Sequence, residues 1–150
     1  MTIGSICNRN VVVAPHDERV VDAARRMRML HVGTVIVVED RGDRRVPIGI
    51  LTDRDIVLSL VAADAEHLPF LTIGDAMSDD PLIGYEDAEL SDALKSMQER
   101  GVRRLPVVNR DGSLVGIISA DDIVRVLAEE IGRLVSLMNR EEQVERRSRL

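Results

Sequence analysis

The sequence predicts a mixed α/β (α+β) fold in which one small β-α-β-β-α unit occurs twice. We expect the two copies to pack as a pseudo-two-fold pair followed by a C-terminal helical extension. The chain of 150 residues repeats itself at a fixed spacing, which is the signature of a duplicated structural unit. The composition is 45% hydrophobic but only 1% aromatic, so the core must be aliphatic, and valine and isoleucine favour strands.

The repeat is read directly from matching segments. Thr-Ile-Gly at residues 2–4 recurs at residues 72–74, an offset of 70 residues that continues through the first half of each copy. Beyond the turns at Gly42 and Gly112 the offset falls to 67, because the first copy carries three extra residues there. Each copy alone would expose a hydrophobic sheet face, so the two copies are expected to pack on each other.

Each copy shows the same order of elements. An extended segment leads to a helix whose apolar residues recur every three or four positions, with Asp17 and Asp87 as the predicted N-caps. A strand, a polar turn with glycine and a second strand follow. The predicted segments are extended residues 11–13 and 81–83, first strands 34–38 and 105–108, second strands 48–51 and 114–118, and second helices beginning at Thr52 and Ser119.

These elements divide the chain into a first repeat at residues 1–62, a linker at 63–71, a second repeat at 72–127 and a C-terminal helical tail at 128–150. A single apolar stripe runs along the last helix. It either packs within the chain or meets a partner helix, most simply in a homodimer. Residues 140–150 are mostly charged and are expected to fray. The stripe consists of Ile123, Leu127, Ile131, Leu134 and Met138.

A strand-to-helix junction of the form Gly-apolar-apolar-Thr/Ser-x-x-Asp occurs in each copy, at residues 49–55 and 116–122. One interpretation is a capping box, in which the hydroxyl caps the helix and the aspartate bonds back to the cap amide. The other is a ligand site. There the helix start and hydroxyl hold an anion, the carboxylate holds a ribose, and the glycine lets a base approach the strand. Both interpretations stay open, since a cap can exchange partners when a ligand binds.

The duplicated unit, its element order and this junction resemble a pair of CBS domains, the cystathionine-β-synthase-type repeat, two of which form a Bateman module. The resemblance covers residues 2–127. It implies a regulatory or sensor module that binds an adenosine-containing nucleotide in the cleft between the repeats and signals by conformational change to an effector protein. AMP, ADP or ATP are the favoured ligands, with S-adenosylmethionine and NAD as further candidates, and no covalent cofactor is expected. The alternative is a dimerisation or docking scaffold without a nucleotide, although the aspartate present in both junctions favours the sensor.

The resemblance also implies roles for individual residues. Asp55 and Asp122 would hold ribose hydroxyls, and Thr52 and Ser119 would contact phosphate or ribose. The residues expected beside the adenine are Val12, Val13, Ile50, Leu82, Ile83 and Ile117.

The two copies differ in charge around this site. Arg54 lies inside the first junction, where a guanidinium can grip a phosphate, whereas Asp121 at the matching position would repel one. Arg103 and Arg104 precede the first strand of the second copy, and the resemblance implies that basic residues there face the cleft. The alternative for these arginines is surface ion pairing.

Composition also weighs against several other functions. A net charge of −6 and almost no aromatic side chains disfavour nucleic-acid binding. No apolar run is long enough to span a membrane and no secretory signal opens the chain, so a cytoplasmic protein is expected. The single cysteine, Cys7, excludes an internal disulfide. Common catalytic motifs and metal-ligand spacing of the histidines are lacking, so neither an enzyme nor a metal site is predicted.

Overall fold

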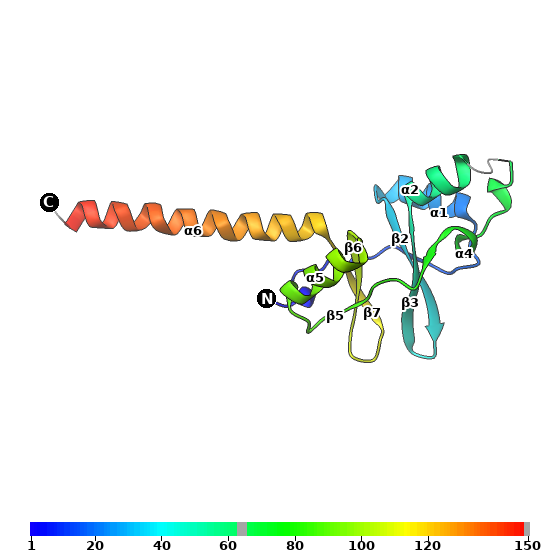
Figure 1. Cartoon of the computed structure of the whole chain (residues 1–150), viewed down its shortest axis with the longest axis horizontal. Coiled ribbons are helices and arrows are strands. Elements are labelled where there is room, and N and C mark those ends of the chain that lie inside the picture. The colour runs from blue at the N-terminus through cyan, green and yellow to red at the C-terminus, as the bar shows by residue number, and fades with distance from the viewer. Residues whose placement is uncertain (63–65, 149–150) are drawn as a thin grey trace. The chain divides into compact units, whose positions relative to one another are not determined.

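The computed structural model describes residues 1–62 and 66–148. It divides into two compact units, residues 1–118 and the residues from Ser119 onward. The first unit contains two β-sheets and the shorter helices, and the second consists mainly of the long helix α6 (Ala120–Ser148) (Figure 1). The predicted α/β (α+β) class, with two tandem repeats followed by a C-terminal helix, is confirmed. Among the residues that the structure describes, no helix is both long and apolar enough to cross a membrane.

The two sheets follow the two repeats. In the first sheet β1 runs parallel to β2, and β2 pairs antiparallel with β3 through partners such as Val35 and Leu51. In the second sheet β5 runs parallel to β6, and β7 lies on the other side of β6. The strands are β1 (Val13–Ala14), β2 (Thr34–Arg41), β3 (Arg44–Thr52), β4 (Ser78–Asp79), β5 (Gly84–Tyr85), β6 (Arg104–Val108) and β7 (Leu114–Ser119).

The helices also occur in matching positions. Helices α1 and α5 have 11 residues each and bury most of their predicted apolar stripes, whereas Leu30 and Leu94 of those stripes are exposed. The short helix after β3 continues as a π-helical segment. In chain order the helical elements of the first unit are η1 (Ile3–Ser5), α1 (Val20–Leu30), α2 (Asp53–Asp55), η2 (Ile56–Val61), η3 (Leu68–Phe70), α4 (Ile73–Ala76) and α5 (Leu90–Arg100).

Each repeat begins with a segment that packs against the other repeat. Ile3 N donates to Ala88 O at 3.0 Å, and the equivalent Ile73 N donates to Glu18 O at 2.7 Å. Farther along, Asn8 forms a bridge with Ile117, while β4 pairs with β3 in the equivalent place. This reciprocal exchange is the structural basis of the pseudo-two-fold pair.

The exchanged segments complete the cores. Ile73 comes from the second repeat but belongs, fully buried, to the first repeat's core together with Val35, Val37 and Leu51. Ile3 is equally buried. Burying an aliphatic side chain of this size stabilises a fold by about 1.5–3 kcal/mol, so each repeat depends on the other for part of its stability.

The predicted N-caps were wrong. Helix α1 begins after Arg19 and α5 after Glu89, and in neither helix does the side chain at the cap bond to the helix. The first helical amides bond instead to backbone carbonyls of the exchanged segments. Val20 N donates to Leu71 O and Leu90 N to Met1 O, both at 3.0 Å. A backbone carbonyl from the linker or from the other repeat therefore takes one of the amide protons that a side-chain cap usually satisfies.

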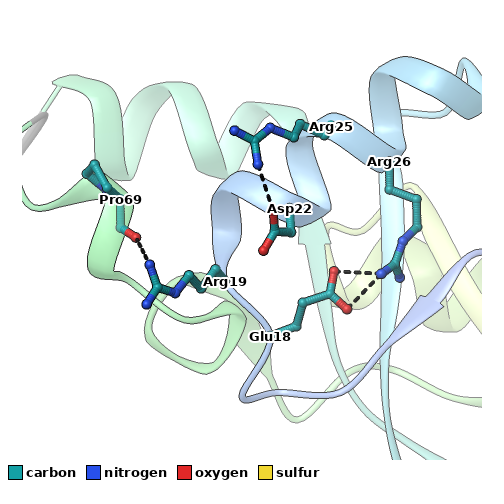
Figure 2. A network of polar contacts seen from close by, with 6 residues as sticks. All are labelled: Glu18, Arg19, Asp22, Arg25, Arg26 and Pro69. Carbon is teal, nitrogen blue, oxygen red and sulfur yellow. Dashed lines mark hydrogen bonds and ion pairs between the residues drawn. The ribbon is translucent and has the colours of Figure 1, made fainter.

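A network of polar contacts secures the chain around α1, and Figure 2 shows it from close by. Arg26 donates to both carboxylate oxygens of Glu18 at 2.7 Å and to the carbonyl of Val13 at 2.7 Å. Arg19 reaches the carbonyl of Pro69 at 3.3 Å, from the region predicted as linker. Residues 63–65 of that linker lie outside the described ranges.

Helix α6 does not fray where the charged residues begin. It continues to Ser148, well past residue 140. Glutamate, glutamine and arginine are good helix formers, and Arg146 forms an ion pair with Glu142, one turn earlier, at 2.6 Å. The high charge of this segment is therefore compatible with a regular helix.

Candidate functional site

A cavity of about 440 Å³ lies within the first unit, between the end of β3 and two segments of the second repeat. We call it the Asp55 cleft. Its size falls within the range of about 300–1,000 Å³ typical of small-molecule sites. Its lining comprises Ile50, Thr52, Asp53, Arg54, Asp55, Ser78, Asp79, Asp80, Pro81, Leu82, Arg100, Gly101, Val102, Arg103 and Arg104.

The junction from β3 into α2 places Thr52 and Asp55 in this cleft as a capping box. The Thr52 amide and hydroxyl donate to Asp55 Oδ2 at 2.8 and 2.7 Å, and the Asp55 amide donates to Thr52 Oγ1 at 3.1 Å. Among the described residues, the other carboxylate oxygen, Oδ1, makes no hydrogen bond. The capping interpretation is thus correct for this junction, and it uses only one of the two oxygens.

Two further capping boxes have the same geometry. Ser119 N and Oγ donate to Asp122 Oδ2 at 3.0 and 2.5 Å in the second unit. Thr72 N and Oγ1 both donate to Asp75 Oδ2 at 2.8 Å, and these hydrogen bonds lower the pKa of Asp75. Because Thr72 and Asp75 do not line the Asp55 cleft, a capping box alone does not mark a ligand site.

Four arginines and four aspartates line the Asp55 cleft. Arg100, the last residue of α5, donates from Nη2 to Asp80 Oδ2 and to its backbone carbonyl, both at 3.1 Å. Within the described ranges, the guanidinium groups of Arg54 and Arg104 form no ion pair or hydrogen bond. Arg104 is half-buried at the start of β6. The cleft thus combines cations suited to phosphate with carboxylates suited to hydroxyl groups.

The structure brings seven of the predicted site residues together. Ile50, Thr52, Arg54, Asp55, Leu82, Arg103 and Arg104 all line the cleft. The remaining six are placed elsewhere. Val12, Val13 and Ile83 lie on or beside the short strands β1 and β5, Ile117 lies on β7, and Ser119 and Asp122 form the capping box of the second unit.

Sequence reasoning missed Asp80 and Arg100 as part of the cleft. Asp80 follows β4, which reaches β3 only through the exchange of segments, and Arg100 is the last residue of a helix. Neither belongs to the repeated junction. The one signal in the sequence was the difference between the repeats at this position: the second repeat has the basic Arg100 where the first has Leu30.

The junction glycines have a different role from the one predicted. A Cβ on Gly49 would collide with Met77 and come within 3.1 Å of the carbonyl of Ser78. A Cβ on Gly116 would come within 2.6 Å of Cys7 Sγ and 3.0 Å of the carbonyl of Asn8. These glycines therefore admit the exchanged segment of the other repeat, not a base.

The thiol of Cys7 fills the space over the second junction glycine, as Met77 does over the first. Burial raises the pKa of Cys7, although the nearby Arg9 acts in the opposite direction. A thiol that resists ionisation is a poor nucleophile. The described ranges also contain no group of three or more His, Cys, Asp or Glu side chains arranged to hold a metal ion.

The fold agrees with the comparison to known families. The CBS domain model matches residues 3–62 and again residues 73–129. The chain belongs to the CBS domain family, as the resemblance in its sequence predicts.

Three individual proteins illustrate the similarity of this chain to other members of known sequence or structure. An uncharacterised protein of Methanopyrus kandleri, MK0525, is 33% identical over 126 residues, which span 84% of this chain but only 62% of that protein. The crystal structure of Hypoxic Response Protein I with two coordinated zinc ions has 33% identity and a TM-score of 0.70, covering 83% of this chain and 98% of that one. The crystal structure of CBSX2 in complex with AMP has 27% identity and a TM-score of 0.70, covering 85% and 96%.

Proposed function

We propose that this chain is a regulatory module that binds an adenosine-containing nucleotide, AMP, ADP or ATP, in the Asp55 cleft. The observation that carries the proposal is the joint lining of one cavity by Thr52 and Asp55 of the first repeat and by Arg103 and Arg104 of the second. A carboxylate and several cations in one cavity match a ribose joined to phosphate.

Each group has a role in this proposal. Asp55 accepts from the ribose hydroxyls through Oδ1, the oxygen that the capping box leaves without a partner among the described residues. Thr52 contacts ribose or phosphate, and Arg54 and Arg104 bind phosphate oxygens with their forked guanidinium groups. The base lies between Ile50 and Leu82, aliphatic residues from opposite repeats that line this cleft.

The position of the cleft supports a signalling role. Its lining comes from both repeats, so a bound ligand bridges them and favours the arrangement that it fits best. A ligand shifts such an equilibrium only through unequal affinity for the two states. An effector protein is expected to read the shift, and that protein, the cytoplasmic location and a non-catalytic role stay predictions.

Relatives support the ligand class. CBSX2, 27% identical to this chain, has been crystallised with AMP. The family membership, which spans both repeats, makes an adenosine compound the first choice for this cleft. S-adenosylmethionine and NAD share the adenosine group and belong in the same test.

Calorimetry and thermal unfolding with AMP, ADP, ATP, S-adenosylmethionine and NAD test the proposal. A ligand that binds only the folded chain at a hundredfold excess over its Kd stabilises it by about 2.7 kcal/mol. Asp55→Asn is expected to weaken binding about 10- to 100-fold, because hydrogen bonds to a charged group are lost. Asp75→Asn is the matched control, since it alters an equivalent capping box outside the cleft. Equal affinity of wild type and Asp55→Asn, or binding of none of these compounds, would contradict the proposal.

The second candidate function is a docking or dimerisation scaffold. The exposed apolar face of α6 favours it, with Ile131 at 61% and Leu134 at 60% exposure. If the chain is such a scaffold, all three capping boxes only stabilise the starts of their helices. The same panel of nucleotides then leaves the unfolding temperature unchanged.

A further inference from the structure

Helix α6 carries an apolar face that its own unit cannot cover, because a single helix has no second element to pack against. Five side chains along it are strongly exposed. The exposed fractions are 65% for Val124, 44% for Leu127, 61% for Ile131, 60% for Leu134 and 67% for Met138. Exposed apolar side chains gathered on one face mark an interaction surface. We call these five residues the α6 seam.

The seam differs from the stripe predicted from the sequence at one position. Ile123, the predicted first member, is 2% exposed, and its neighbour Val124 takes its place on the exposed face. With Val124 included, the steps between seam residues alternate between three and four. This is the a/d spacing of a heptad repeat, the pattern by which two helices wrap around each other.

The residue types in the seam indicate the kind of partner. Val124 and Ile131 occupy a positions and are β-branched, whereas Leu127 and Leu134 occupy d positions. This distribution of residues favours a coiled coil of two parallel helices over larger helical assemblies. A second copy of the same chain offers the same seam in the same register.

The face of α6 opposite the seam is largely polar. Ser136, opposite the seam, donates to the carbonyl of Gly132, and Arg133 forms an ion pair with Glu130 at 2.7 Å within the helix. The next two core positions of the heptad are Glu141 and Glu145, whose charges would face their own copies in a parallel pair. The seam therefore ends at Met138.

The exposed surface is large enough for a specific contact. The seam is flanked by Val135, 50% exposed, and Leu137, 62% exposed. These seven apolar side chains present on the order of 500 Å² per chain, or about 1,000 Å² for a pair, which reaches the lower limit of about 1,000 Å² expected of an interface between proteins.

We propose that two copies of this chain associate in parallel and in register through the α6 seam. The interface is isologous, with each seam residue facing its own copy across a two-fold axis. It is independent of the Asp55 cleft, because every residue in it belongs to the second unit. The association is expected whether or not a nucleotide is bound.

Disulfide trapping in the full chain tests orientation and register together. Cys7 is the only cysteine, so in a Cys7→Ala background each added cysteine is unique. Leu134→Cys places two thiols face to face in a parallel d layer, within the Cα separation of about 4.4–6.8 Å that a disulfide requires. Ser136→Cys, two residues away on the opposite face, is the matched control. We expect Leu134→Cys to oxidise to a covalent dimer and Ser136→Cys to stay monomeric on a non-reducing gel.

The mass in solution gives a second, independent reading. Light scattering should give wild type twice the chain mass of 16.6 kDa. Leu134→Glu should weaken the dimer at least tenfold, and Ser136→Glu should leave it unchanged. A monomeric wild type, a dimer that survives Leu134→Glu, or a Leu134→Cys variant that forms no disulfide overturns the proposal.

Discussion

Arg100 forms an ion pair with Asp80 within the lining of the Asp55 cleft, with Nη2 3.1 Å from Oδ2. The same nitrogen donates to the backbone carbonyl of Asp80 at 3.1 Å. Asp80 adopts a left-handed backbone conformation with φ of 50°, which aspartate and asparagine tolerate better than most residues. A carboxylate of the protein thus holds one of the four arginines that line the cleft, in competition with any phosphate that binds there.

Asp80→Asn is therefore expected to strengthen the binding of phosphorylated nucleotides. Removing the carboxylate charge breaks the ion pair that holds Arg100, although its bond to the backbone carbonyl of residue 80 stays, and it removes a source of repulsion near the phosphates. Because both side chains are largely exposed, the gain should be small, about two- to fivefold in Kd for ATP. Calorimetry at low ionic strength measures it. Adenosine, which carries no phosphate, is the control ligand and should bind wild type and variant equally; an equal gain for adenosine would show that the effect does not involve phosphate.

The Thr72–Asp75 capping box should make stability depend on pH. Its hydrogen bonds hold the pKa of Asp75 below the ordinary value of 3.8. The unfolded chain therefore takes up this proton first, and the stabilisation is present above pH 3.8 and lost as pH falls through the folded-state pKa. Asp75→Asn removes the titrating group. The difference in urea midpoint between wild type and Asp75→Asn should be constant near neutral pH and shrink in acid, and a difference that stays constant to the acid limit would contradict this account.

Local patterns in the sequence were enough to predict the elements of each repeat. The apolar spacing around Val20, Ala23 and Met27 predicted helix α1, and the glycine turns predicted the two hairpins. These features depend on residues close together in the chain. The capping box, one of the two interpretations left open for each junction, is present at both, and it could be predicted because hydroxyl and carboxylate lie only three residues apart.

The exchange of leading segments was not predictable from such patterns. It joins residues far apart in the chain, as in the bonds from Ile3 to Ala88 and from Ile73 to Glu18, and no local signal marks it. Three errors follow from this one omission. The helix caps were assigned to Asp17 and Asp87, the ligand-site interpretation of the junctions placed a base against their glycines, and Asp80 was left out of the cleft.

Gly49→Ala tests the exchange at its tightest point. The added methyl group would collide with Met77, and crowding a packed interior costs about 1–3 kcal/mol. In a Met77→Ala background the same substitution should cost less, because the crowding side chain is gone. Urea unfolding of the four proteins in this double-mutant cycle measures the coupling. Strictly additive effects would show that Gly49 and Met77 do not crowd each other.

Ile3→Ala should destabilise both repeats, although Ile3 lies at the start of the first. Its side chain is fully buried, and a Cβ on Gly84 of the second repeat would lie 2.5 Å from Ile3 Cδ1. Truncating a buried isoleucine costs about 2–5 kcal/mol. Circular dichroism reports the secondary structure of the whole chain, α6 included, and the fluorescence of Tyr85, the only tyrosine, reports β5 of the second repeat.

Both signals should move together in a single transition at lower urea, because each repeat contains a buried isoleucine of the other. Ile73→Ala, the equivalent change in the second repeat, should behave in the same way, whereas Val57→Ala at a residue 56% exposed should have little effect. If Ile3→Ala splits unfolding into two transitions, the repeats are independent domains. The reciprocal exchange of segments would then contribute little to their stability.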